Sequence, residues 1–278
     1  MSYKHILTPV ISVEEDEVAL RATAALAAAF EAQATALVVA VHPGSEFAPR
    51  HAPLSDVLVD IAKGPKALAK VQRAAIVAAI KRLERSFDVR DVDAEVALID
   101  GEVVSHARCA DLVVLARTSA REHAHGAMLV SVLFGAGRPV YVVPQDWNAR
   151  QAPERVLVGW NAKREAVRAI NDAMPFLIRA KQVTVATVDA KPKTDGHGEA
   201  PGREIAAHLA RHGVTVDVRN IDGIGRTHGK ALIDEARAVG AELIVTGAYG
   251  HSRAAEFLFG GVTRELLATS PMPLLLSH

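Results

Sequence analysis

The segment Gly247–Thr263, near the end of the chain, holds the residues best suited to chemistry. A Gly-x2-Gly-x9-Gly spacing runs through it and leads into three further residues, the whole set being Gly247, Gly250, Gly260, Gly261, Val262 and Thr263. Glycine allows positive φ and lets main-chain N–H groups approach an anion without an intervening Cβ. The segment also opens an expected helix, Thr263–Ala268, whose start would add free amides, a positive dipole and a hydroxyl. This pattern predicts binding of phosphoryl groups.

Other reactive side chains give weaker signals. His251 and Ser252 follow Gly250 and are candidates for phosphate contact. As a Ser–His catalytic pair they lack an orienting acid, and neighbours in sequence seldom hold that geometry. His123 and His125 form an H-x-H pair, but a metal site needs three or four ligands, and neither HExxH nor paired CxxC is present. We therefore predict no catalytic residue and no metal site.

Short apolar runs alternate with longer segments of helical period, which predicts an α/β fold with a parallel sheet. Helices are expected over Glu14–Ala32 and over Lys163–Leu177, where Pro175 should kink or end the helix. In such a sheet, ligands bind at the carboxyl ends of the strands, where the loop after Gly247 lies. Five strands are expected in each half: His5–Val10, Ala36–Val41, Ala94–Ile99, Asp111–Ala116 and Pro139–Val143, then Arg155–Gly159, Val183–Val188, Val214–Val218, Glu242–Gly247 and Pro273–Leu276.

The two halves of the chain match each other in sequence beyond their shared composition. The matching pairs are HILTPV at His5 with RVLVGW at Arg155, HARCADLVVLA at His106 with EARAVGAELIVTG at Glu235, and GRPVYVVP at Gly137 with SPMPLLLS at Ser270. Because the matches include residues outside the strands, a tandem duplication is favoured over two unrelated α/β halves. We predict one domain over residues 1–147 and a second over 148–278, joined by a short polar linker with prolines.

The first copy of this repeat has lost the glycine spacing. The replacements are Ala116 for Gly247, Ser119 for Gly250, Met128 for Val262 and Leu129 for Thr263, while Gly126 still matches Gly260. The loop is also shorter, and its apolar residues would face the phosphates. The first half is therefore interpreted as a structural partner with a degenerate motif.

The glycine spacing, together with the strand opening RVLVGWNAKREAVRAI and the ending SPMPLLLS, resembles the nucleotide-binding signature of the universal stress protein family, in its tandem two-domain type. The resemblance covers both halves and implies two five-stranded parallel sheets flanked by helices, each Rossmann-like, pairing through their last strands. It also implies ATP binding, with the six residues of the Gly247–Thr263 pattern holding ribose and phosphates. Trp160, Asn161 and Val188 would flank the adenine. Family members usually carry aspartate where Asn161 stands, and serine or threonine where Gly261 stands.

Composition narrows the class of protein. Lysine plus arginine equals aspartate plus glutamate, 32 against 32, so a nucleic-acid partner, which would need a basic surface, is not expected. The N-terminus lacks a signal-peptide pattern and no apolar run is long enough to span a bilayer, so no membrane partner is expected either. The lone Cys109, interpreted as a packing residue, fits a reducing compartment. These features predict a cytoplasmic protein.

Three hypotheses about function stay open. The first is a regulatory stress protein, expected to form a homodimer, that binds ATP or another adenine nucleotide through its second half. The second is a structural or protein-interaction stress module without a ligand, favoured by Asn161, Gly261 and the degenerate first half. The third, an ATP-hydrolysing or adenylyl-transferring enzyme, lacks an evident general base. The stretch Gly223–Gly229 is one residue too long for a dinucleotide fingerprint and is interpreted as a flexible connection.

Overall fold

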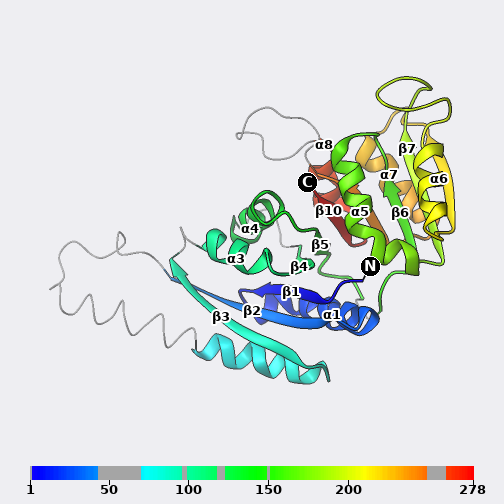
Figure 1. Cartoon of the computed structure of the whole chain (residues 1–278). Helices are drawn as coiled ribbons and strands as arrows, with labels where there is room; N and C mark the ends of the chain where they lie inside the picture. The colour runs from blue at the N-terminus through cyan, green and yellow to red at the C-terminus, as the bar shows by residue number, and fades with distance from the viewer. Residues whose placement is uncertain (1, 43–69, 96–98, 118–122, 149–150, 249–260) are drawn as a thin grey trace, which may run out of the picture.

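The computed structural model describes residues 2–42, 70–95, 99–117, 123–148, 151–248 and 261–278. Ten strands of these residues form one sheet in the order β3-β2-β1-β4-β5-β10-β9-β6-β7-β8 (Figure 1). The strands are β1 His5–Val10, β2 Gln33–His42, β3 Phe87–Glu95, β4 Leu112–Ala116, β5 Val140–Val143, β6 Arg155–Gly159, β7 Gln182–Val188, β8 Val216–Ile221, β9 Leu243–Gly247 and β10 Leu274–Ser277.

The two halves of the sheet join at their last strands. Neighbouring strands are parallel within each half, whereas β5 and β10 are antiparallel, with Tyr141 opposite Leu275. The predicted fold class, two copies of a five-stranded parallel α/β unit, is confirmed. So is the expectation that the last strands cover each other, which removes two unpaired edges that would otherwise invite association.

Helices cover both faces of the sheet. Leu26 of α1 and Ile170 of α5 belong to the core on one face, while Val132 of α4 and Ile233 of α7 belong to the core on the other. Each half is therefore a three-layer α/β sandwich. The helices are α1 Val13–Phe30, α3 Ile99–Ala107, α4 His123–Gly135, α5 Arg164–Arg179, α6 Arg203–Arg211, α7 His228–Ala238 and α8 Gly261–Thr269, and residues 70–82 are also helical.

Aromatic side chains from both halves pack together on the face covered by α1 and α5. Phe176 of α5 lies 5.0 Å from Phe30 and 5.5 Å from Tyr3 between ring centroids, and it stacks on Tyr141 of β5 at 5.7 Å. The Tyr3 hydroxyl donates a hydrogen bond to the Asp172 main-chain oxygen at 2.6 Å. Edge-to-face and stacked rings stabilise beyond their buried area, so this cluster holds the two halves as one unit.

Two predicted elements were wrong. The third strand was expected at Ala94–Ile99, but β3 spans Phe87–Glu95 and α3 begins at Ile99. An edge strand tolerates charge because one side faces solvent, and its charged residues hid the strand pattern. Pro175 was expected to kink or end its helix, and an end at the proline is wrong, because α5 continues to Arg179. Burial of Phe176 directly after the proline outweighs the lost main-chain hydrogen bond.

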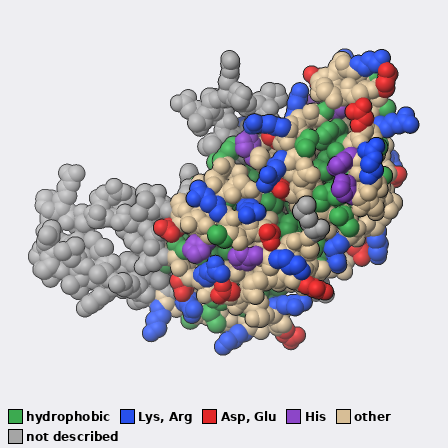
Figure 2. Space-filling view, viewed as in Figure 1, with side chains coloured by type: hydrophobic (Ala, Val, Ile, Leu, Met, Phe, Trp, Pro, Cys, Tyr) green, Lys and Arg blue, Asp and Glu red, His purple; other side chains and the backbone are tan. Residues whose placement is uncertain are grey.

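The surface carries both signs of charge. On the face drawn in Figure 2, basic and acidic side chains are interspersed. Within the described ranges, no helix combines the length and apolarity that a bilayer crossing requires. The same residues contain no cluster of three or more His, Cys, Asp or Glu suited to a metal ion. Cys109 is exposed, so its interpretation as a packing residue was wrong.

Candidate functional site

The carboxyl edge of the second half-sheet brings most of the predicted site residues together. β6 lies between β7 and β9, with Gly159 in register with Ala186 and with Thr246, so the three strands end side by side. Gly250, His251, Ser252 and Gly260 lie outside the described residues. The others are placed as follows: Trp160 and Asn161 after β6, Val188 at the end of β7, Gly247 at the end of β9, and Gly261, Val262 and Thr263 in the first turn of α8.

The turn after β6 is shaped by its own hydrogen bonds. The Trp160 amide donates to the Ala186 main-chain oxygen at 2.8 Å, and the Trp160 ring packs on the core beneath α5. Asn161 is exposed, and its side-chain oxygen accepts a bond from the Lys163 amide at 3.1 Å. Asparagine can do this and still present an NH2 donor, which an aspartate in the same place would not have.

Gly247 has a steric reason to be glycine. A Cβ added there would lie 2.5 Å from the Glu165 main-chain carbon and 2.6 Å from the Ala166 nitrogen. The first turn of α5 can therefore pack on the end of β9 only because Gly247 has no side chain. Gly261 differs, since a Cβ there would meet no atom of the described residues within 4 Å. The two motif glycines thus have different roles: Gly247 allows close packing, whereas the described structure sets no such requirement at Gly261.

A buried carboxylate stands beside Gly247. Glu165, in the first turn of α5, is 7% exposed and accepts a hydrogen bond from Arg164 Nε at 2.7 Å. Burial works to raise the pKa of Glu165. A side-chain hydrogen bond from Arg164, a main-chain hydrogen bond at Glu165 itself, and the charges of Arg164 and His278 outweigh it and hold that pKa below its ordinary value. The His278 ring in turn lies 4.5 Å from the ring of Phe134, on α4 of the first half. The sequence did not predict Glu165, Arg164 or His278 as part of the site. Only Glu165 had a signal in the sequence, because it is an acid in the first turn of a helix.

The first turn of α8 supplies the anion-binding groups that the sequence predicted. The amides of Gly261, Val262 and Thr263 are the first of the helix and have no partner within it. They point along the positive end of the helix dipole. Gly261 is exposed, Val262 is half-buried and Thr263 is only 4% exposed. The turn therefore offers main-chain donors more than it offers a hydroxyl.

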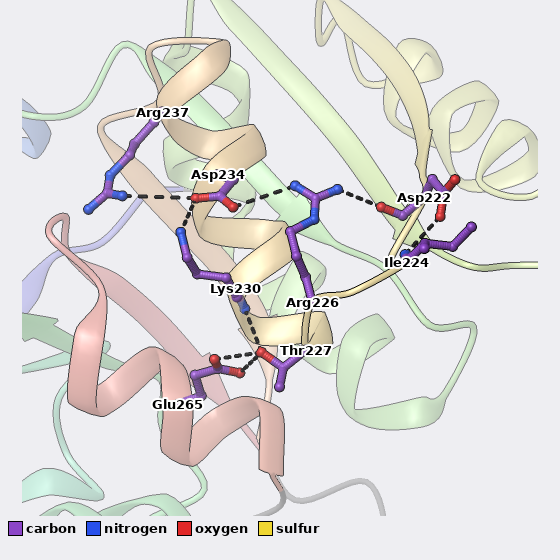
Figure 3. A network of polar contacts seen from close by, with 8 residues as sticks. All are labelled: Asp222, Ile224, Arg226, Thr227, Lys230, Asp234, Arg237 and Glu265. Carbon is purple, nitrogen blue, oxygen red and sulfur yellow. Dashed lines mark hydrogen bonds and ion pairs between the residues drawn. The ribbon is translucent and has the colours of Figure 1, made fainter.

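The stretch Gly223–Gly229 is neither a dinucleotide loop nor an untethered connection. The Gly223 amide donates to Asp189 Oδ1 at 2.9 Å, and the Ile224 amide donates to Asp222 Oδ1 at 2.8 Å. Figure 3 shows how the following residues link this turn to α7 and α8. The turn lies after β8, and its contacts with Asp189 hold it beside the end of β7 at the carboxyl edge.

In the first half, the apolar residues that replace the motif residues are buried. Ala116, Met128 and Leu129 are buried at 3%, 1% and 7% exposure. The apolar replacements therefore face the core, not a ligand loop as predicted. Ser119 lies outside the described residues. Arg117, directly after β4, donates a hydrogen bond to the Ser270 main-chain oxygen at the end of α8, so this edge contacts the second half.

The comparisons with known proteins agree with this architecture. The family model described as "Universal stress protein family" matches residues 153–278. A universal stress protein from Archaeoglobus fulgidus DSM 4304 has 16% identity and a TM-score of 0.70, covering 98% of this chain and 95% of that chain. A putative universal stress protein from Pseudomonas aeruginosa UCBPP-PA14 has 14% identity and a TM-score of 0.59, covering 99% of this chain and 93% of that chain.

A universal stress protein solved in complex with cAMP matches a shorter part, with 26% identity and a TM-score of 0.37, covering 46% of this chain and 99% of that chain. No curated protein has significant sequence similarity to this chain. Fold and site define an α/β protein of paired Rossmann-like units. Residues 153–278 match the universal stress protein family, and the chain as a whole shares the fold of the Archaeoglobus fulgidus protein.

Proposed function

We propose that the chain is a regulatory, non-catalytic stress protein whose second domain, residues 148–278, binds an adenine nucleotide such as ATP. The start of α8 is the observation that carries this proposal. Gly261 begins that helix at the carboxyl edge of the sheet and is exposed, and a Cβ there would meet no described atom within 4 Å, so we expect its amide to reach an anion. A phosphate tail suits such a turn because several N–H donors and the helix dipole act on it together.

The remaining contacts follow from the same edge. Trp160, Asn161 and Val188 would flank the base, because they lie at the ends of β6, which pairs with β9, and of β7, which pairs with β6. The loop from Gly247 to α8, with Gly250, His251, Ser252 and Gly260, would supply ribose and phosphate contacts. We propose binding without turnover, since the buried Glu165 carboxylate beside this edge is engaged by Arg164 and the Glu265 carboxylate of α8 is engaged by Thr227. The nucleotide would act as a regulatory ligand.

The first domain, residues 1–147, acts in this proposal as a built-in partner that completes the ten-stranded sheet. A homodimer of chains would need a surface other than the last strands, since β5 and β10 already pair within one chain. We also propose a cytoplasmic protein, because its single cysteine gives no internal disulfide.

The test removes one amide from α8 without disrupting the helix. Proline is well tolerated at the first position of a helix and has no N–H, so Gly261→Pro deletes one of the proposed donors. Gly261→Ala keeps the N–H and is the reference for the added side-chain atoms. Calorimetric titration with ATP should give binding by the wild type and weaker binding by Gly261→Pro than by Gly261→Ala. No binding by the wild type at millimolar ATP would refute the proposal.

One observation favours the alternative of a ligand-free structural or protein-interaction module. Gly247 is accounted for by packing against Glu165 and Ala166, and Asn161 by its bond to Lys163, so neither needs a nucleotide to explain it. Mass spectrometry of small molecules released from freshly purified protein separates the two proposals. An adenine nucleotide carried through purification would exclude the ligand-free module.

A further inference from the structure

One side chain joins the start of α7 to α8. Thr227 is the N-cap of α7, where its hydroxyl oxygen accepts a hydrogen bond from the Lys230 amide at 3.3 Å. The same hydroxyl donates to the carboxylate of Glu265 on α8, 2.6 Å from each carboxylate oxygen (Figure 3). A hydroxyl can do both at once because it is a donor and an acceptor. The contact therefore links two helices through one threonine.

The surroundings are fitted to the Glu265 carboxylate. A Cβ added at Gly229 would lie 2.4 Å from Glu265 Oε2 and 2.9 Å from its carboxyl carbon. Glycine within a helix is unfavourable, but its missing side chain leaves room here for the Glu265 carboxylate. The negative charge also lies at the positive end of the α7 dipole, where it is stabilised. Thr227 and Gly229 thus form a seat for Glu265.

This seat acts on the part of α8 that carries the proposed phosphate donors. Glu265 is the fifth residue of α8, and helical side chains lean toward the N-terminus of their helix, so its carboxylate lies alongside the first turn. Leu266, fully buried, anchors the helix to the core. Because Glu265 and Leu266 are both held in place, the amides of Gly261–Thr263 have a fixed direction.

The internal repeat offers a comparison within the chain. Counting back from the matched prolines Pro139 and Pro273, Ser131 stands at the position of Glu265. Counting back from the matched His106 and Glu235, Asp100 stands at the position of Gly229. Neither the carboxylate on the second helix nor the glycine on the first is present in the first half. The half without the glycine spacing is thus also the half without these two residues.

We infer that Glu265 is a positioning residue: through Thr227 and Gly229 it fixes the first turn of α8 so that its amides converge on a phosphate group. This inference rests on the proposed nucleotide binding and adds a residue outside the glycine pattern. It predicts an effect confined to the phosphates, because the groups proposed to flank the base lie on other strands.

The experiment compares Glu265→Ala, Glu265→Gln and Thr227→Val by calorimetric titration with ATP and, separately, with adenosine. Glu265→Ala and Thr227→Val each break the contact, while Glu265→Gln keeps an acceptor for Thr227. Arg237→Ala is the matched control, since it removes only an exposed ion pair 3.9 Å from Asp234 on the same helix. We expect Glu265→Ala and Thr227→Val to bind ATP about tenfold more weakly, the scale of one charge-assisted hydrogen bond. Adenosine binding, Glu265→Gln and Arg237→Ala should stay near the wild type.

The outcomes separate the two proposals. No binding of ATP by the wild type would refute the proposed function and this inference with it. Binding of ATP by the wild type with no change in Glu265→Ala would refute the positioning role alone. Equal losses for ATP and adenosine would mean that the contact supports the fold and not the phosphate site, and would also overturn the inference.

Discussion

Replacing Gly247 by alanine should destabilise the protein in the absence of any ligand. The added Cβ would stand 2.5–2.8 Å from main-chain and Cβ atoms of Glu165 and Ala166. Ordinary contact begins near 3.4 Å, so the first turn of α5 must move by about 1 Å. Backbone atoms cannot rotate away as the end of a long side chain can, so relief comes only from shifting the helix.

The cost can be estimated from that displacement. Overpacking in a well-packed core costs about 1–3 kcal/mol, and the upper end applies because Ala166, Ala169 and Ile170 of α5 are each at most 3% exposed. At about 2–4 °C per kcal/mol, a loss of about 3 kcal/mol lowers the Tm by about 6–12 °C. Gly261→Ala is the matched control, because its Cβ enters open space and should leave the Tm unchanged or slightly raised.

The assay is thermal unfolding of nucleotide-free protein followed by circular dichroism, with urea unfolding as a second measure. Gly247→Ala should lower the Tm, whereas Gly261→Ala should not. Equal unfolding temperatures for wild type and Gly247→Ala would show that the end of β9 and the start of α5 are not packed as described. Gly247 would then be explained by ligand binding instead.

Three further predictions concern the interface, the buried acid and assembly. Phe176→Ala should lower the free energy of unfolding by about 3–5 kcal/mol, because its ring is 1% exposed and touches both halves; urea unfolding checks this, and a loss no larger than that of the half-exposed Phe134→Ala would contradict it. Because the pKa of folded Glu165 is lowered, its ionised form contributes stability above its ordinary pKa of 4.5, and that contribution disappears as the pH falls through the folded pKa. The stability gap between wild type and Glu165→Gln, measured in urea, should be full at pH 7 and shrink below about pH 4.5, whereas a constant gap would refute the assignment. Light scattering should give a particle of about 59 kDa, twice the chain mass of 29.5 kDa, and a 29.5 kDa particle would rule out the homodimer.

Much of the fold could be predicted because buried parallel strands are continuous apolar runs. β1 and β6 have the predicted bounds, β4, β5 and β9 differ by one residue at their start, and β10 is shifted by one residue. These strands occupy the middle of the sheet, where both faces are covered and only apolar residues are tolerated. Their sequences therefore carry an unambiguous signal.

The edge strands could not be read in the same way. β3 reads FDVRDVDAE and β8 reads VDVRNI, with Asp-Val-Arg in both. Arg90 bonds Asp88 on the solvent side at 2.7 Å, and most of β8 is exposed. Charged residues protect an open edge, so the apolar alternation is weak. The shared Asp-Val-Arg, compared between the two halves, is the signal that could have placed β3.

The candidate site was predictable only where it depends on the main chain. Glycine spacing and position after a strand located the carboxyl edge and the start of α8, because those features follow from local geometry. Glu165 and Glu265 were missed because their roles arise from contacts with residues far away in sequence, Gly247 in one case and Thr227 in the other. Periodicity and spacing cannot reveal a carboxylate's partner on another element.

The central claim is that one half of the chain holds a nucleotide and the other has lost the means to do so. Native mass spectrometry of the wild-type protein titrated with ATP counts the bound molecules directly. The account predicts one ATP per 278-residue chain at saturation, reduced by Gly261→Pro. Two ATP molecules per chain would contradict the loss of the site in the first half. No bound ATP at millimolar concentration would contradict the proposed site in the second half.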